Sequence, residues 1–218
     1  MRESFVNKKM NGILFDLDGT LWDSSDYVVE SWNQVLAKYG RKQITVRDMR
    51  HYMGRTMEAI AKMMMPDESD EMREKIFKEC CDNEVMFLRQ HGGILFNHLE
   101  ETLLKLQKRY RLFVVSNCQI GYIEAFLQYH QLEKYFDDTE NYGRTGLEKG
   151  ENIKLVVERN HLDKAVYVGD VQGDLDSADM AGIPFIHAAY GFGTVNRKVP
   201  KINDITELPD CVEKLFGE

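Results

Sequence analysis

The chain has 218 residues, of which 43% are hydrophobic and 29% charged, and its formal net charge is −8. This composition is typical of a globular protein with one large domain, or with a core and a smaller second lobe. The acidic balance, without a long run of Lys or Arg, disfavours nucleic acid and anionic membranes as partners.

The sequence also indicates the location of the protein and the redox state of its cysteines. No stretch approaches the roughly 18 consecutive apolar residues of a spanning helix, and the first residues, MRESFVNKKMNG, are too polar for a signal peptide. We therefore expect a cytoplasmic protein without a membrane partner. The four cysteines include no pair at C-x-x-C spacing, which predicts reduced thiols rather than a disulfide framework or a zinc site.

The first predicted element is a strand over residues 12–15, which runs directly into the two acids Asp16 and Asp18. Unpaired acids are rarely buried, and two carboxylates this close repel each other unless a cation lies between them. The end of this strand therefore predicts a site that holds a cation.

Residues 24–90 contain helical patterns and no strand pattern. A first helix is expected to begin at Ser24 or Ser25 and to end at Gly40. A second ends before Pro66, and a third begins at Ser69. We interpret residues 24–90 as an all-helical lobe inserted after the first strand, with linkers near residues 21–24 and 91–96. Residues 1–23 and 91–218 would then form the core.

After this lobe, short apolar runs alternate with helical patterns. The further strands are predicted at residues 112–116, 135–137, 165–169 and 183–187. Continuous apolar runs are typical of strands that are covered on both faces. Strand–helix alternation of this kind predicts an α/β fold with a doubly wound parallel sheet, similar to a Rossmann fold.

Polar residues stand at the ends of these strands or in the loops beside them. In an open parallel sheet, ligands bind outside the carboxyl ends of the strands, so residues far apart in sequence meet there. The residues concerned are Asp16, Asp18, Thr20, Ser116, Asn117, Lys149, Asp170 and Asp174.

These residues occur in four short motifs that resemble those of the haloacid dehalogenase superfamily. The first motif, D-x-D-G-T, is residues 16–20; Ser116 matches the second, Lys149 the third, and G-D-x-x-x-D at residues 169–174 the fourth. Many relatives have Pro after the lysine, whereas this chain has Gly150. D-x-D-G-T alone could be an ordinary strand-to-turn junction, but the ordered set favours a catalytic site. The helical lobe is similar to the cap of the subgroup with phosphoglycolate phosphatase and β-phosphoglucomutase.

The resemblance implies roles for the acids. Asp16 would be the nucleophile, and Asp18 the acid that protonates the leaving oxygen and then deprotonates water. Mg²⁺ would be the cofactor, because it is a hard cation that prefers oxygen ligands. Its ligands would be Asp16, the main-chain carbonyl of Asp18 and Asp170, with Asp174 as a ligand or as support for the ligands.

The resemblance also implies phosphate-binding residues. Thr20, Ser116, Asn117 and Lys149 would hold the phosphoryl oxygens that the metal leaves free. Arg55, in the helical lobe, either reaches a second anionic group of the substrate or is a solvated surface residue.

The expected function is a Mg²⁺-dependent phosphatase that hydrolyses a small phosphorylated metabolite, phosphoglycolate-like or a sugar phosphate, through an aspartyl-phosphate. A sugar-phosphate mutase similar to β-phosphoglucomutase is the nearest alternative, since it shares the core residues. A receiver-like signalling module, with a phosphorylated aspartate as a switch, is a third, against which the lobe and the second acid argue. The sequence leaves the substrate and the oligomeric state open.

Overall fold

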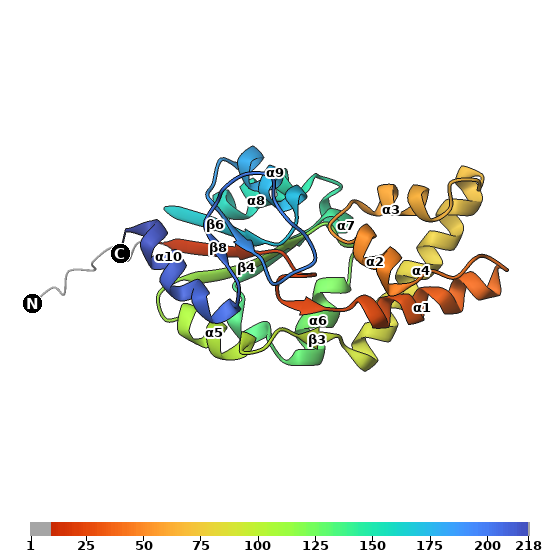
Figure 1. Cartoon of the computed structure of the whole chain (residues 1–218), viewed down its shortest axis with the longest axis horizontal. Helices are drawn as coiled ribbons and strands as arrows, with labels where there is room; N and C mark the ends of the chain where they lie inside the picture. The colour runs from red at the N-terminus through yellow and green to blue at the C-terminus, as the bar shows by residue number, and fades with distance from the viewer. Residues whose placement is uncertain (1–9, 218) are drawn as a thin grey trace, which may run out of the picture.

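The computed structural model describes residues 10–217, which form a six-stranded parallel sheet between two layers of helices (Figure 1). The strand order is β5-β4-β1-β6-β7-β8, and each neighbouring pair is parallel. The strands are β1 (Asn11–Phe15), β4 (Arg111–Ser116), β5 (Asp138–Asn141), β6 (Lys164–Gly169), β7 (Phe185–Ala188) and β8 (Lys201–Ile202). The predicted α/β fold is confirmed.

The two faces of the sheet have separate apolar cores. On one face, Ile13 and Phe15 belong to the core that includes α5 (Leu99–Leu106), α6 (Tyr122–His130) and α10 (Leu208–Phe216). On the other face, Leu14 packs with α8 (Lys149–Arg159) and α9 (Gln172–Ala181). Because side chains alternate along a strand, a strand buried on both faces is largely apolar, as β1 is from Gly12 to Phe15.

The strand order reverses between β1 and β6. From β1 the chain proceeds to β4 and β5 on one side, and it then returns to place β6 on the other side of β1. The carboxyl ends of β1 and β6 are therefore adjacent, at the place where open α/β sheets bind their ligands.

Four helices lie to one side of the sheet, at the right of Figure 1. They are α1 (Ser25–Lys38), α2 (Val46–Tyr52), α3 (Met57–Met64) and α4 (Asp70–His91). Trp32 of α1 meets Phe77 of α4 edge to face, with ring centroids 5.3 Å apart. The chain enters this helical lobe through β2 (Trp22–Asp23) and leaves it through β3 (Ile94–Leu95). These two strands pair antiparallel, so the two connections lie side by side.

The strand predicted at residues 135–137 is wrong. Residues Glu133–Tyr135 form a 3₁₀ helix, η1, and the strand β5 begins only at Asp138. The apolar side chain of Phe136 does not belong to a strand; its ring packs edge to face on Phe15, with centroids 6.2 Å apart. The true strand lies at the edge of the sheet and is polar, since Asp138 and Glu140 form ion pairs with Arg159 of α8.

The remaining described elements are short. They are α7 (Tyr142–Thr145) and η2 (Ile205–Glu207). None of the described helices combines the length and the apolar character that crossing a membrane requires.

Candidate active site

The turn after β1 packs tightly against the turn after β6. Gly19 has a φ of +78°, and a Cβ there would lie 2.3 Å from Oδ2 of Asp170. A Cβ on Gly191, in the loop after β7, would lie 2.3 Å from the Gly19 carbonyl oxygen. Only glycine fits such close contacts, and Gly19 must also adopt a positive φ, so the two glycines allow three separate loops to close on one point.

Three buried aspartates and one buried lysine meet at this point. Asp16, Asp170 and Asp174 each offer a carboxylate oxygen within 4.8 Å of the others. Lys149, the first residue of α8, places Nζ 2.9 Å from Oδ1 of Asp16 and 2.6 Å from Oδ1 of Asp174. Three carboxylates against one ammonium would leave two net negative charges if all were ionised.

This crowding shifts the proton affinities of the cluster. Burial and Asp174 raise the pKa of Asp16 to about 7, against the opposing charge of Lys149. Burial, with Asp174 and Asp16, raises the pKa of Asp170 to about 8. Burial alone would lower the pKa of Lys149, but the two carboxylates outweigh it and raise that pKa. A cation bound among these carboxylates would offset their mutual repulsion.

The donor set fits a hard divalent cation. Oδ1 of Asp170 is buried and has no hydrogen-bond partner among the described residues, while Oδ2 accepts from the Phe192 N–H at 2.7 Å. Both oxygens of Asp174 are engaged, Oδ1 by Lys149 and Oδ2 by the N–H groups of Asp170 and Val171. An unpaired buried carboxylate oxygen is costly unless a proton or a cation binds it.

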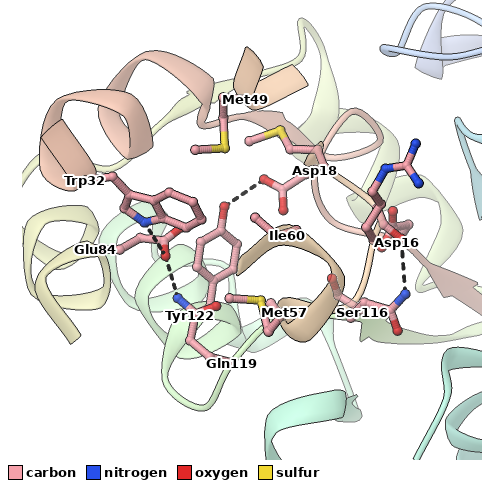
Figure 2. A pocket seen from close by; sticks show the side chains of 15 residues that line it. Asp16, Asp18, Trp32, Met49, Met57, Ile60, Glu84, Ser116, Gln119 and Tyr122 are labelled. Atoms are coloured by element: carbon pink, nitrogen blue, oxygen red, sulfur yellow. Dashed lines mark hydrogen bonds between the residues drawn. The ribbon is translucent and has the colours of Figure 1, made fainter. Parts of the chain in front are cut away.

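Asp18 lies apart from this cluster and points toward Tyr122 (Figure 2). Its Oδ1 accepts hydrogen bonds from Trp22 Nε1 at 2.9 Å, Ser24 Oγ at 2.8 Å and Tyr122 OH at 2.8 Å. Burial raises the pKa of Asp18 to about 6, although these three donors lower it. Ser24 precedes α1, as predicted, but its side chain binds Asp18 instead of capping the helix.

The predicted phosphate-binding residues lie at the end of β4, in the turns after β1 and β4, and at the start of α8. Ser116 ends β4 and lines the cavity above Asp16. The Asn117 side chain donates to the Gly54 carbonyl at 3.1 Å and so contacts the helical lobe. Oγ1 of Thr20 is buried without a hydrogen-bond partner among the described residues. Neither Ser116 nor Asn117 caps α6, whose N-cap residue is Gly121.

A cavity lies between these residues and the helical lobe (Figure 2). The core side carries Asp16, Asp18 and Ser116, and the lobe side is mostly apolar. Arg55 lies at this cavity, but its side chain is exposed and its Nε donates to the His51 carbonyl at 3.2 Å. The structure thus gathers Asp16, Asp170, Asp174 and Lys149 in one cluster, and it places Asp18, Ser116 and Asn117 at the adjoining cavity. Thr20 follows Asp18 in the turn after β1, and Arg55 lies at the margin of the cavity.

Residues 13–188 match the family model described as haloacid dehalogenase-like hydrolase. The chain belongs to this family. The phosphoglycolate phosphatase of Aquifex aeolicus is 26% identical over 212 residues, covering 92% of this chain and 97% of that protein. The phosphoglycolate phosphatase of Escherichia coli is also 26% identical over 212 residues, covering 84% of this chain and 82% of that protein.

Solved structures share the fold of this hydrolase. A haloacid dehalogenase-like family protein from Streptococcus pneumoniae superposes with a TM-score of 0.80 at 18% identity, covering 93% of this chain and 98% of that one. CbbY from Rhodobacter sphaeroides, in complex with xylulose-(1,5)bisphosphate, gives 0.76 at 18% identity, covering 91% and 96%. The family and the curated relatives together make the chain a phosphatase of the haloacid dehalogenase family.

Two residues of this phosphatase were not among the predicted site residues. Tyr122, in the first turn of α6, binds Asp18 through its hydroxyl group. Glu84 of α4 is 4% exposed and lines the cavity from the lobe side. A signal for Glu84 exists in the sequence: it stands at i+4 from Cys80 and at i−4 from Leu88, on the buried face of the helix.

Proposed function

We propose that this protein is a Mg²⁺-dependent phosphatase that hydrolyses a small phosphate monoester through an aspartyl-phosphate on Asp16. One observation carries the proposal: Asp16, Asp170 and Asp174 lie buried together with Lys149 where β1 and β6 end. The curated relatives named phosphoglycolate phosphatase support a small phosphorylated substrate.

The carboxylates of Asp16 and Asp170 and the main-chain carbonyl of Asp18 would hold the metal. Bound there, Mg²⁺ would offset the negative charge of the phosphoryl oxygens and hold the phosphate beside Asp16. Asp174 keeps Lys149 and the turn before α9 in place, since both its oxygens already accept hydrogen bonds. Lys149, Ser116, Asn117 and Thr20 bind the other phosphoryl oxygens.

In the first step, a carboxylate oxygen of Asp16 attacks phosphorus and the bond from phosphorus to the alcohol oxygen breaks. Asp18 gives its proton to that leaving oxygen. In the second step, water attacks the phosphorus of the aspartyl-phosphate while the Asp18 carboxylate takes a proton from it, and phosphate leaves Asp16. A pKa of about 6 suits both roles, because the group can be protonated or ionised near neutral pH.

We also propose that residues 24–90 act as a cap that closes over the site, with residues 1–23 and 91–218 as the catalytic core. Three contacts support this arrangement. Asn117 donates to the Gly54 carbonyl, Gln119 donates to Glu84 at 2.7 Å, and the Arg50 guanidinium lies over the Phe192 ring. Closure of such a lobe excludes bulk water from the aspartyl-phosphate until the alcohol has left.

The test is hydrolysis of p-nitrophenyl phosphate by protein stripped of metal with EDTA and dialysed. We expect no turnover without metal, many turnovers per site with Mg²⁺, and poor recovery with Ca²⁺, which prefers more ligands at longer distances. Asp170→Asn should remain inactive at the same Mg²⁺ concentration. Full activity of the metal-free protein would refute the metal requirement.

The same assay separates the alternatives. A receiver-like module would release at most one phosphate per protein molecule, because its aspartate is a switch. A sugar-phosphate mutase would convert a β-hexose 1-phosphate to the 6-phosphate in the presence of the bisphosphate, with little free phosphate. Repeated phosphate release without isomerisation is the result that the proposed function requires.

A further inference from the structure

The lobe side of the cavity contains one buried acid, Glu84. Its side chain comes from the middle of α4 and faces the same space as Trp32, Met49, Met57 and Ile60 (Figure 2). Burying a carboxylate in such apolar surroundings costs free energy. An uncharged residue would cost less at a position with a purely structural role.

One oxygen of Glu84 is committed and the other is available. Trp32 Nε1 donates at 3.0 Å and Gln119 Nε2 at 2.7 Å, and both hydrogen bonds end on Oε2. Among the described residues no hydrogen bond reaches Oε1, and protein atoms do not enclose this oxygen completely. The bonds at Oε2 thus fix the carboxyl group while Oε1 stays accessible to a molecule in the cavity.

The charges around the cavity oppose a second anion on the substrate. The charged residues that line it are Asp16, Asp18, Glu84 and Arg55. Arg55 is exposed, and its Nε is already bound to the His51 carbonyl, whereas Glu84 is buried. Above pH 8, where Glu84 is ionised, a carboxylate on the leaving group would therefore meet a like charge where the medium screens it poorly. Phosphoglycolate carries such a carboxylate.

We propose that Glu84 is a specificity-determining residue, and that it selects a leaving group bearing a hydrogen-bond donor, an ammonium or a hydroxyl group, instead of a second anion. This inference rests on the proposed phosphatase function and names its substrate class: monoesters of a small alcohol with a donor group at the end remote from the phosphate. The apolar walls fit the intervening carbon atoms, and the Trp32 ring offers a π face to a cation.

The protonation of Glu84 is compatible with either donor. Burial raises the pKa of Glu84 to about 8, while the hydrogen bonds from Trp32 and Gln119 oppose the rise. An arriving ammonium group would pair with the ionised carboxylate, whereas a hydroxyl group can donate to either form. The two donors therefore differ in how they respond to the loss of this charge.

The test compares four two-carbon phosphate esters that differ only in the remote group: O-phosphoethanolamine, 2-hydroxyethyl phosphate, ethyl phosphate and 2-phosphoglycolate. Each is assayed for kcat/KM with Mg²⁺ present at pH 9, where Glu84, with a pKa of about 8, is ionised, and the readout is the ratio of each value to that for ethyl phosphate. For the natural sequence we expect a ratio of about ten or more for at least one donor substrate, and a ratio below one for phosphoglycolate.

Glu84→Gln is the decisive variant, because an amide oxygen can still accept from Trp32 and Gln119 while the negative charge is removed. The phosphoglycolate ratio should rise by about tenfold or more. The O-phosphoethanolamine ratio should fall by a similar factor if the donor is an ammonium group, and the 2-hydroxyethyl ratio should change less. Glu71→Gln, on the exposed start of the same helix, is the matched control and should leave every ratio unchanged.

The outcomes separate the two proposals. Phosphoglycolate as the preferred ester, or ratios that Glu84→Gln does not alter, would overturn the role of Glu84 and leave the phosphatase standing. Failure to hydrolyse any of the four esters and p-nitrophenyl phosphate would instead refute the proposed function. The melting temperature of each variant, measured in parallel, shows that a changed ratio comes from a folded protein.

Discussion

Asp16 is buried with two other acids, and this placement makes its removal informative about both catalysis and stability. Asp16→Asn should lower kcat by on the order of 10³-fold or more, because an amide is a poor nucleophile. The pKa of Asp16, raised to about 7, means that its ionised form destabilises the fold at pH 8. The variant should therefore melt at the same temperature as the natural protein, or higher. Substantial residual turnover would assign the nucleophile to another residue.

Tyr122 supplies one of the three hydrogen bonds to Oδ1 of Asp18, and these bonds lower the pKa of that acid. Tyr122→Phe should therefore raise the pKa of Asp18, and the corresponding limb of the kcat/KM profile should move to higher pH. The free energy of unfolding should fall by about 1 kcal/mol. Tyr39→Phe, which removes a hydroxyl bound to Glu79 on the lobe surface, is the control. Superimposable profiles for the two variants would contradict this role of Tyr122.

At the scale of the elements, α4 carries an ionisable group on its buried face. Folding raises the pKa of Glu84 from 4.5 to about 8. Between these values the folded chain holds a proton that the unfolded chain has lost. The contribution of Glu84 to the free energy of unfolding therefore decreases as pH rises, by up to about 1.4 kcal/mol per pH unit, and it levels off above pH 8.

Glu84→Gln removes this titration, so its melting temperature relative to the natural protein should increase steadily from pH 5 to pH 8. Thermal unfolding followed by circular dichroism at several pH values measures the difference. The subtraction cancels the titration of the catalytic aspartates, which both chains share. A difference that stays constant across this range would show that Glu84 has an ordinary pKa in the folded protein.

The elements were predictable where burial leaves a clear pattern. The buried strands β1, β4 and β6 are continuous apolar runs, and the sequence locates them within a residue at each end. The edge strand β5 reads DTEN and was misplaced, because its polar side chains pair with α8 rather than with a core. The sequence analysis does not predict the helix α2, since it has only 7 residues and buries only Met49, although Thr45 and Asp48 form a capping box.

Over the whole molecule, the catalytic cluster could be predicted because a parallel sheet brings its strand ends to one edge. Asp16 and Asp170 meet from positions 154 residues apart by that rule alone. The contacts of Glu84 with Gln119 and of Tyr122 with Asp18 follow no such rule. They depend on how the helical lobe and α6 pack above the sheet, which local sequence patterns do not encode.

The charge of the cluster should also couple metal binding to the stability of the whole fold. Mg²⁺ that binds Asp16 and Asp170 only in the folded chain stabilises it by about 1.4 kcal/mol at ten times the dissociation constant. For a chain of this size, that corresponds to a rise in melting temperature of roughly 3–6 °C. Asp170→Asn should raise the metal-free melting temperature, because it removes a buried carboxylate, and it should abolish the increase with Mg²⁺. Differential scanning calorimetry with 0–10 mM MgCl₂ measures both effects, and an equal increase in the two chains would place the metal elsewhere.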